Sequence, residues 1–118
     1  MHPNAPQNPT GKFNGDGSVS ISFDPVEGAK SYVIHYANAN ESNPHKAKMM
    51  GYSETNSWTL AAENVPSLVE GDKFYLYVQT FNELGEGSNE IEKAEFLNEN
   101  KLGSAWSEPI ILTKGGSN

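Results

Sequence analysis

The chain contains neither cysteine nor arginine among its 118 residues. Without cysteine it can form no disulfide, perform no thiol chemistry and build no cysteine metal site. Arginine supplies the two-pronged fork that recognises phosphate and carboxylate groups. Its absence, together with a net charge of −7, argues against nucleic acids and anionic membranes as partners. We therefore expect no nucleic-acid partner.

The sequence also lacks an apolar run near the ~18 residues that a membrane-spanning helix requires, so we expect no membrane insertion. Met1 is followed by His2, Pro3 and Asn4, without the basic start and apolar stretch of a signal peptide. We therefore expect either a piece of a larger exported protein or a virion component, which needs no signal. The expected location is extracellular, at a cell surface or a virion surface.

Length and terminal composition predict one domain with a joint at each end. Residues 1–6 begin a stretch rich in proline and asparagine and are predicted to form a linker or lead-in. Residues 7–114 are the predicted domain, and residues 115–118, with glycine and serine, are predicted to form a flexible tail. Such joints are expected of a module within a longer chain.

Segments in which apolar and polar residues alternate recur at short spacing along the predicted domain. They predict strands at residues 10–13, 18–24, 31–37, 48–54, 56–62, 73–81 and 108–113, of which the first and fourth are weak. Seven short alternating strands within ~100 residues predict an all-β, two-sheet antiparallel sandwich. The inward-facing residues of both sheets would fill one core.

Four of these regions, taken in order, match the pattern of a known family. They are "APQNPTG" (5–11), "GSVSISFDPVEGAKSYVIHY" (17–36), "LVEGDKFYLYVQTFNELG" (68–85) and "SAWSEPIILT" (104–113). Over residues 5–114 the chain resembles a fibronectin type III module of the kind common in bacterial and phage surface proteins. The resemblance implies a seven-stranded, immunoglobulin-like β-sandwich, in which a long loop or short helix is inserted before the last strand.

The chain departs from this family at two positions of the expected core. Phe23 stands where the family usually has tryptophan in its second strand, and Trp58 is expected to supply the missing bulk. Phe74 occupies the tyrosine-corner position and has no hydroxyl to bond to the backbone, at a cost of about 1 kcal/mol. Neither departure conflicts with the predicted fold.

A glutamate-rich insertion at residues 83–104 separates the sixth predicted strand from the last. Within it, the segment from Asn89 to Asn100 consists largely of good helix formers. Ser88 or Asn89 could cap the start of a helix, because their side chains accept backbone N–H bonds. We therefore predict a helical turn or short helix that lies against the end of the sandwich.

Charges and apolar residues within the insertion fit this helix. Glu90 and Glu92 would stabilise the first turn of the helix, where the helix dipole is positive, and Lys101 would stabilise its last turn, where the dipole is negative. Gly103 would end the helix. A narrow apolar stripe would face the sandwich, formed by Ile91, Ala94 and either Leu97 or Phe96. The alternative is a lengthened hairpin that carries Ile91 and Phe96.

Six glutamates lie within residues 83–99. A catalytic acid–base pair needs one carboxylate with a shifted pKa in an apolar pocket, and a calcium loop needs closely spaced acidic residues at a tight glycine turn. Neither pattern occurs, so we expect no catalytic residue and no cofactor. The insertion is predicted to be a solvated acidic face, with a partner-contacting loop or a cation site as alternatives.

In the family arrangement the third and sixth strands are neighbours, and their outward residues share one face. Tyr75, Tyr77 and Phe81 would point outward from the sixth strand, and Val33 and His35 from the third. An exposed aromatic face could stack on sugars or contact a protein. Alternatively, an edge loop, the insertion or a neighbouring module covers this face.

Three further residues lie on or beside this face. His35 is expected to be a surface histidine, Ile111 of the last strand is expected to face the same way, and Trp106 is expected to be half-buried at the rim of the sandwich. The candidate ligand- or partner-contacting residues are therefore His35, Tyr75, Tyr77, Phe81, Glu90, Phe96 and Trp106.

These observations predict a non-catalytic module of a bacterial or phage surface or virion protein. It would act as a spacer and as a weak adhesin for host cell-surface carbohydrate or protein. Two alternatives stay open. In the first, the chain is a purely structural element without its own ligand, either a decoration of a virion tail or capsid or an inter-domain spacer. In the second, it is an accessory module of a secreted carbohydrate-active enzyme. Its partners would be cell-surface carbohydrate, protein, or neighbouring modules of the same assembly.

Overall fold

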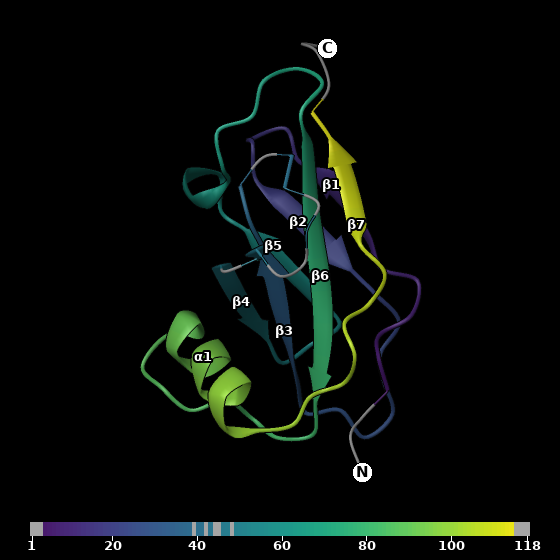
Figure 1. Cartoon of the computed structure of the whole chain (residues 1–118), viewed down its shortest axis with the longest axis vertical. Helices are drawn as coiled ribbons and strands as arrows, with labels where there is room; N and C mark the ends of the chain where they lie inside the picture. The colour runs from purple at the N-terminus through teal and green to yellow at the C-terminus, as the bar shows by residue number, and fades with distance from the viewer. Residues whose placement is uncertain (1–3, 39, 42, 44–45, 48, 115–118) are drawn as a thin grey trace.

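A computed structural model describes residues 4–38, 40–41, 43, 46–47 and 49–114 (Figure 1). The predicted tail and the first three residues of the predicted lead-in lie outside the described residues. The elements in chain order are β1 (Thr10–Phe13), β2 (Val19–Ser22), β3 (Ser31–Tyr36), β4 (Met49–Ser53), β5 (Ser57–Leu60), η2 (Ala62–Asn64), β6 (Lys73–Phe81), α1 (Glu90–Asn100) and β7 (Ile110–Thr113). No helix among the described residues is long and apolar enough to span a membrane.

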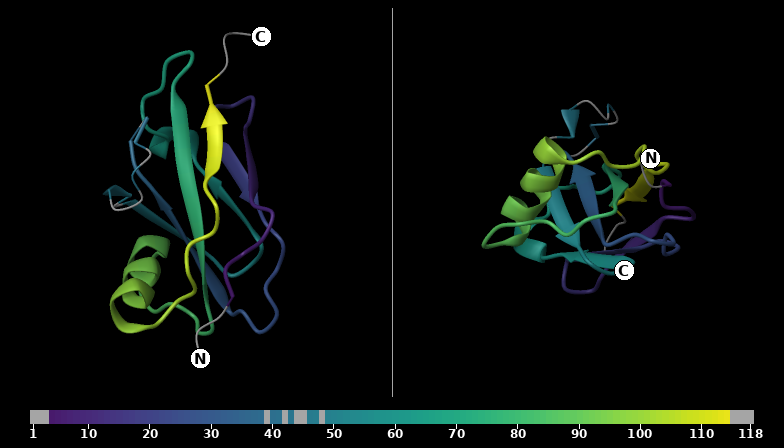
Figure 2. Two further views of the ribbon diagram at one scale, coloured as in Figure 1. Left: turned by 45° about the vertical axis from the view of Figure 1, so that its right-hand side comes forward. Right: turned by 90° about the horizontal axis from the view of Figure 1, so that it is seen from below.

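The seven strands form two antiparallel sheets, as predicted. One sheet has the order β1-β2-β5 and the other the order β4-β3-β6-β7. The sheets face each other across a core, and α1 lies outside both layers (Figure 1, Figure 2). The order makes β4 and β5 edge strands of their respective sheets.

The alternating residues fill the space between the sheets. Val19 and Ile21 of β2 pack with Leu76 and Val78 of β6 in one cluster of buried residues. Pro6 of the predicted lead-in is also fully buried. Burial of each large apolar side chain contributes roughly 1.5–3 kcal/mol before conformational entropy is subtracted.

Trp58 supplies bulk to this core, as expected from the family departure at Phe23. Phe23 lies directly after β2 and meets Tyr32 edge to face, with ring centroids 4.6 Å apart. Trp58 packs against the same core from β5, with its ring centroid 5.9 Å from that of Tyr36. It fits because Gly51 faces it from β4: a Cβ at Gly51 would lie 2.2 Å from the Trp58 ring.

The segment before β7 is held to β6 by two serines that use both backbone and side chain. Ser104 donates its backbone N–H to the Thr80 carbonyl at 2.9 Å, and its hydroxyl accepts the Thr80 N–H at 2.9 Å. Ser107 repeats the arrangement with Val78, at 2.7 and 2.9 Å. The serine hydroxyls therefore satisfy backbone donors of β6 that have no strand partner there.

The predicted helix is present and the alternative hairpin is not formed. Asn89 caps α1, because its side-chain oxygen accepts the Glu92 N–H at 2.9 Å. The Glu92 carboxylate in turn accepts the Ser88 backbone N–H at 3.1 Å. These bonds satisfy donors at the helix start. The bonds that the Glu92 carboxylate accepts, from Ser88 first, lower the pKa of Glu92. They account for why the helix begins where the sequence predicts.

The end of α1 and one side of its apolar stripe differ from the prediction. Lys101, not Gly103, follows the last helical residue, and its N–H bonds to the Leu97 carbonyl at 2.9 Å. Gly103 lies instead against β6, where a Cβ would come within 2.6 Å of the Gln79 side chain. Ile91 is 59% exposed, so it is not part of the buried stripe. The stripe is formed by Ala94 and Leu97.

Candidate functional site

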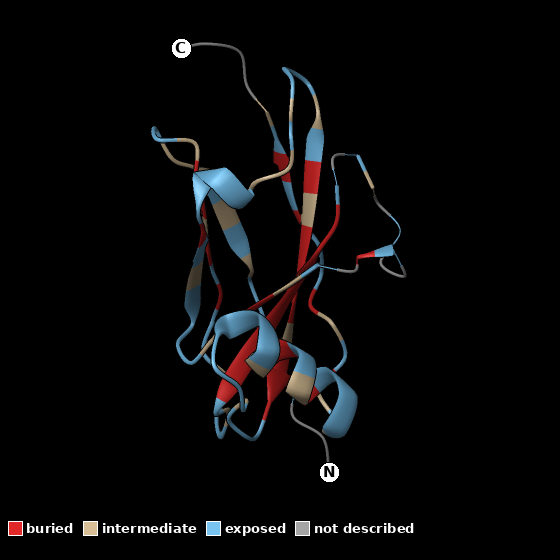
Figure 3. Cartoon of the chain, turned by 90° about the vertical axis from the view of Figure 1, so that its left-hand side faces the viewer, coloured by how far each residue is buried: buried red, intermediate tan, exposed pale blue. Residues whose placement is uncertain are grey.

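The outward face of the four-stranded sheet is covered, so the expectation of an exposed aromatic face is wrong. His35 is 2% exposed, Tyr77 5% and Phe81 1%. The alternative that the insertion and an edge loop cover this face is confirmed. Figure 3 shows buried strand residues directly behind α1.

Helix α1 covers the end of this face where β6 finishes. Its buried residues Ala94 and Leu97 pack against Val33, Tyr52 and Phe81 of three neighbouring strands, and these five residues form the α1 cluster. The helix therefore lies on a sheet face near the end of the sandwich. It is present there because an apolar stripe needs an apolar partner, which the outward residues of β3, β4 and β6 provide.

Trp106 covers the middle of the face. Its ring stacks on His35 with centroids 4.0 Å apart and planes 13° apart, and it lies 5.4 Å from the Tyr77 ring. Trp106 is half-buried, as predicted, but His35 is not a surface residue. The alanines of the β3–β4 loop, Ala37 and Ala47, complete this cluster.

Burial decides the charge of His35. Burial lowers the pKa of His35 to about 4, against a smaller opposing effect of the hydrogen bond to Gln79. That bond joins His35 Nε2 to Gln79 Oε1 at 2.8 Å. The imidazole is therefore neutral near pH 7, which suits a ring that stacks against tryptophan in a dry environment.

The last part of the face stays open, and it is small. Tyr75 is half-buried, and Ile111 beside it is 51% exposed. Phe96 is half-buried against the α1 cluster, where the Lys101 ammonium lies 5.9 Å from its ring centroid. The seven predicted contact residues are thus divided among separate environments and form no single surface.

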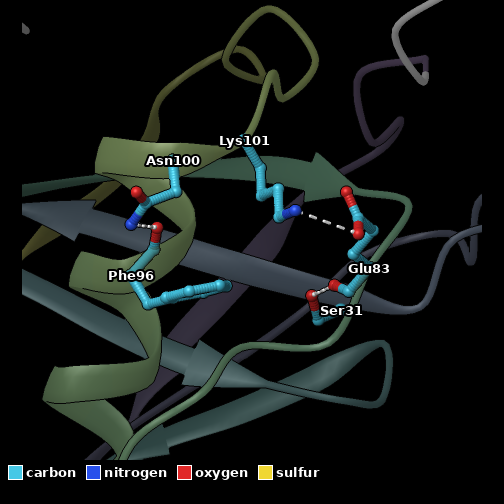
Figure 4. Close-up of polar contacts among 5 residues, drawn as sticks. All are labelled: Ser31, Glu83, Phe96, Asn100 and Lys101. Atoms are coloured by element: carbon cyan, nitrogen blue, oxygen red, sulfur yellow. Dashed lines mark hydrogen bonds and ion pairs between the residues drawn. The ribbon is translucent and has the colours of Figure 1, made fainter.

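The C-terminal end of α1 is tied to the first residue of the insertion, Glu83, which follows β6 (Figure 4). Lys101 Nζ lies 3.3 Å from the Glu83 carboxylate, and the Ser31 hydroxyl donates to the Glu83 backbone carbonyl. Within the helix, the Asn100 side chain donates to the Phe96 carbonyl at 2.8 Å. These contacts fix the helix against the sheet rather than forming a pocket.

A groove that the sequence did not predict lies between α1 and the two edge strands. Its volume is about 420 Å³, and residues of β3, β4, β5, η2 and α1 line it. The apolar lining includes Tyr36, Met49, Trp58, Leu60 and Ile91. Within it Met49 is 38% exposed, so apolar side chains of the groove are accessible to solvent.

One hydrogen bond joins the two sides of the groove. The Trp58 indole N–H donates to the Glu90 carboxylate at 3.2 Å, which links β5 to the first turn of α1. Glu90 was a predicted contact residue, and its partner Trp58 was assigned to the core alone. Trp58 has both roles, because it packs against the core cluster and also lines the groove.

No feature of the sequence indicates that Ile91 lies in the groove. Its spacing from Ala94 places both residues on one side of a helix, so it was assigned to the buried stripe. In the structure the first turn of α1 lies beside the groove, so Ile91 lines the groove instead. Helical periodicity alone does not show where the supporting sheet ends.

The glutamates of the insertion do not assemble a metal site in the described part of the chain. No group of three or more histidine, aspartate or glutamate side chains is close enough there to hold a metal ion. Glu83 pairs with Lys101, and Glu92 caps its own helix. These carboxylates have structural roles at the two ends of α1.

Comparison with known proteins shows the fold. The structure resembles the fn3 domain of the human collagen alpha-1(XX) chain, with TM-score 0.62, 13% identity, and coverage of 100% of this chain and 90% of that one. It resembles an Fn3-like protein from Clostridium thermocellum, with TM-score 0.57, 14% identity, and coverage of 100% and 99%. The FN5 domain of Drosophila Lar gives TM-score 0.52, 15% identity, and coverage of 98% and 99%.

No protein-family model matches the sequence, and no curated protein matches it. The identities to the similar structures are low, so they establish architecture and not activity. The chain has the fibronectin type III fold, as the family resemblance implied. Domains of this fold are generally non-catalytic modules.

Proposed function

We propose that the chain is a non-catalytic, protein-binding module of a larger protein at a cell or virion surface. Its contact surface would be the groove between α1, β4 and β5. The surface location rests on the resemblance of its sequence to surface modules. The observation that supports binding is the exposure of apolar side chains, Met49 and Ile91, on both sides of a groove beside Trp58. Exposed apolar surface in a concavity is typical of interaction sites.

A protein partner fits the groove better than a carbohydrate does. Of the three β6 rings expected to stack on sugars, those of Tyr77 and Phe81 are buried and that of Tyr75 is half-buried. Of the aromatic rings that line the groove, Trp58 already uses its N–H on Glu90. Methionine and isoleucine offer apolar contact rather than the flat ring on which sugars stack. Edge strands beside an apolar groove are a common arrangement for peptide recognition.

The proposal is tested by selecting binders from a random peptide library displayed on phage, with the immobilised chain as target. Selected peptides are then titrated into the labelled chain, and amide NMR shifts are followed. We expect shifts at Met49, Trp58 and Ile91. Ile91→Ser should weaken binding about tenfold, because it removes an apolar contact worth about 1.4 kcal/mol.

Ile111→Ser is the matched control, because Ile111 is similarly exposed, at 51%, and does not line the groove. It should leave peptide affinity unchanged. Selection that yields no peptide, or peptides whose shifts cluster around Tyr75 and Ile111, would overturn the groove as the contact surface. A spacer without its own ligand would then be the better description.

A further inference from the structure

The charged side chains that line the groove in the described part of the chain are all negative. Glu90 and Glu95 are the charged side chains among the described residues that line it, and both are exposed. Glu90 accepts one hydrogen bond, from Trp58, although a carboxylate can accept about four. The groove therefore presents carboxylate oxygens next to an apolar lining.

The lysines of the insertion are directed away from these carboxylates. Lys93 places its ammonium 5.6 Å from the centroid of the Tyr52 ring, which lies under the helix in the α1 cluster. Lys101 pairs with Glu83 at the other end of α1. Neither lysine lines the groove. Within the described residues, no lysine lines the groove, so its negative charge favours a cationic ligand.

The borders of the groove suit an extended backbone. β4 and β5 are edge strands of different sheets, so each has one side without a strand partner. They are joined by the turn at residues 54–56, and residues from both strands line the groove. A peptide added beside an edge strand gains backbone hydrogen bonds, while its side chains enter adjacent pockets.

We infer that the groove binds an extended peptide in which lysine or arginine flanks an apolar side chain. The apolar side chain would contact Trp58, Met49 and Ile91, and the cation would meet Glu90 and Glu95. This inference rests on the proposed function, because it names the partner for the same groove. The chain's net charge of −7 would further favour association with a basic segment and make binding sensitive to salt.

Three synthetic peptides with blocked ends test the inference. The first has the sequence Thr-Lys-Leu-Lys-Val-Thr, and in the others both lysines are replaced by glutamine or by glutamate. We expect the lysine peptide to shift the amides of Met49, Trp58 and Ile91. The glutamine peptide should bind about tenfold more weakly, the glutamate peptide should not bind, and added salt should weaken the lysine peptide.

Variants of the chain locate the charge effect. Glu90→Gln combined with Glu95→Gln should weaken the lysine peptide about tenfold and leave the glutamine peptide unchanged. Glutamine at position 90 keeps an oxygen that can accept the Trp58 N–H, so the groove should keep its shape. Glu99→Gln is the matched control, because Glu99 is an exposed glutamate of α1 that does not line the groove. It should not change affinity.

The outcomes separate this inference from the proposed function. Library peptides that bind in the groove without basic residues, or binding unaffected by Glu90→Gln and Glu95→Gln, would overturn the inference and leave a protein-binding groove. Failure of both the library and the lysine peptide to bind the groove would overturn both. Groove shifts caused by chitin or mannan oligosaccharides, with no peptide bound, would replace the peptide with a glycan.

Discussion

The two faces of the four-stranded sheet are both largely buried, but by different means. On the inner face, Phe74, Leu76 and Val78 meet residues of the opposite sheet in one continuous cluster. On the outer face, two smaller clusters are covered by separate segments, one by α1 and one by Trp106. Strand alternation assigns residues to the two faces of a sheet. Whether a face is buried depends on whether other segments of the chain have apolar side chains that pack against it.

The difference also affects how the stability of the chain should respond to mutations on each face. The inner cluster joins both sheets, so its loss removes the reason for the sandwich to form. The α1 cluster joins one helix to one sheet and can open without separating the sheets. Local opening of such a unit needs less free energy than global unfolding. The outer face is therefore expected to behave as an attached unit on a stable sandwich.

The largest expected effect comes from the same truncation made on each face. Leu76 and Leu97 are both fully buried, one in the inner cluster and one under α1. Leu76→Ala should lower the free energy of global unfolding by about 2–5 kcal/mol, because it leaves a cavity in the core. Leu97→Ala should cost a similar amount in the stability of α1 packing, with a smaller effect on global unfolding.

Urea denaturation and amide hydrogen exchange distinguish the two cases. After Leu76→Ala, protection should fall in strands of both sheets. After Leu97→Ala, it should fall chiefly in residues 90–100 while the inner strands keep theirs. Equal loss of protection throughout the chain in both variants would show that α1 belongs to the same cooperative unit as the sandwich.

The sequence predicted the inner face better than the outer one for a physical reason. In β2, Val19 and Ile21 alternate with serines, so the pattern defines one buried side. In β6, Leu76 and Val78 have the aromatic Tyr77 between them, so the pattern left the exposure of the outer residues open. The family resemblance placed the third and sixth strands side by side, and the capping residues Ser88 and Asn89 indicated where the helix begins.

The groove could not be predicted because it depends on distances between segments far apart in the sequence. Trp58 and Glu90 are hydrogen-bonded across 32 positions of the chain. Gly51 contributes by leaving room for the Trp58 ring, an effect that no local pattern reveals. The sequence identified Glu90 as a candidate contact and Trp58 as a bulky residue. Their contact, and the place of Ile91 beside them, required the packed helix.

A second prediction concerns the Trp106 cluster on the outer face. His35 has a pKa of about 4 in the folded chain because it is buried, whereas its ordinary value is 6.5. The unfolded chain therefore binds the proton more readily, and the free energy of unfolding should decrease as pH falls from about 6.5 toward about 4. The full loss is about 3 kcal/mol, since a tenfold difference in proton affinity corresponds to about 1.4 kcal/mol.

An NMR titration of the His35 ring measures the folded-state pKa directly, and urea denaturation across the same pH range measures the stability. His35→Gln is the control, because it removes the titrating group. Asp16, Asp72 and Glu92, whose pKa values are lowered by hydrogen bonds, are present in both proteins, so their effects cancel. A His35 pKa near 6.5, with equal pH dependence in both proteins, would contradict the expected burial of this ring.

The smallest expected effect contrasts the polar residues of the two faces. On the outer face His35 and Gln79 bond to each other, whereas Thr80 points inward with a buried hydroxyl that has no partner among the described residues. Thr80→Val keeps the shape and removes this unpaired group, so it should raise the free energy of unfolding by about 1 kcal/mol in urea denaturation. Thr113→Val, at an exposed position, should stay within about 0.5 kcal/mol of the original chain. A loss of stability in Thr80→Val would mean that the hydroxyl has a bonding partner, such as a buried water, and that polar groups are paired on both faces of the sheet.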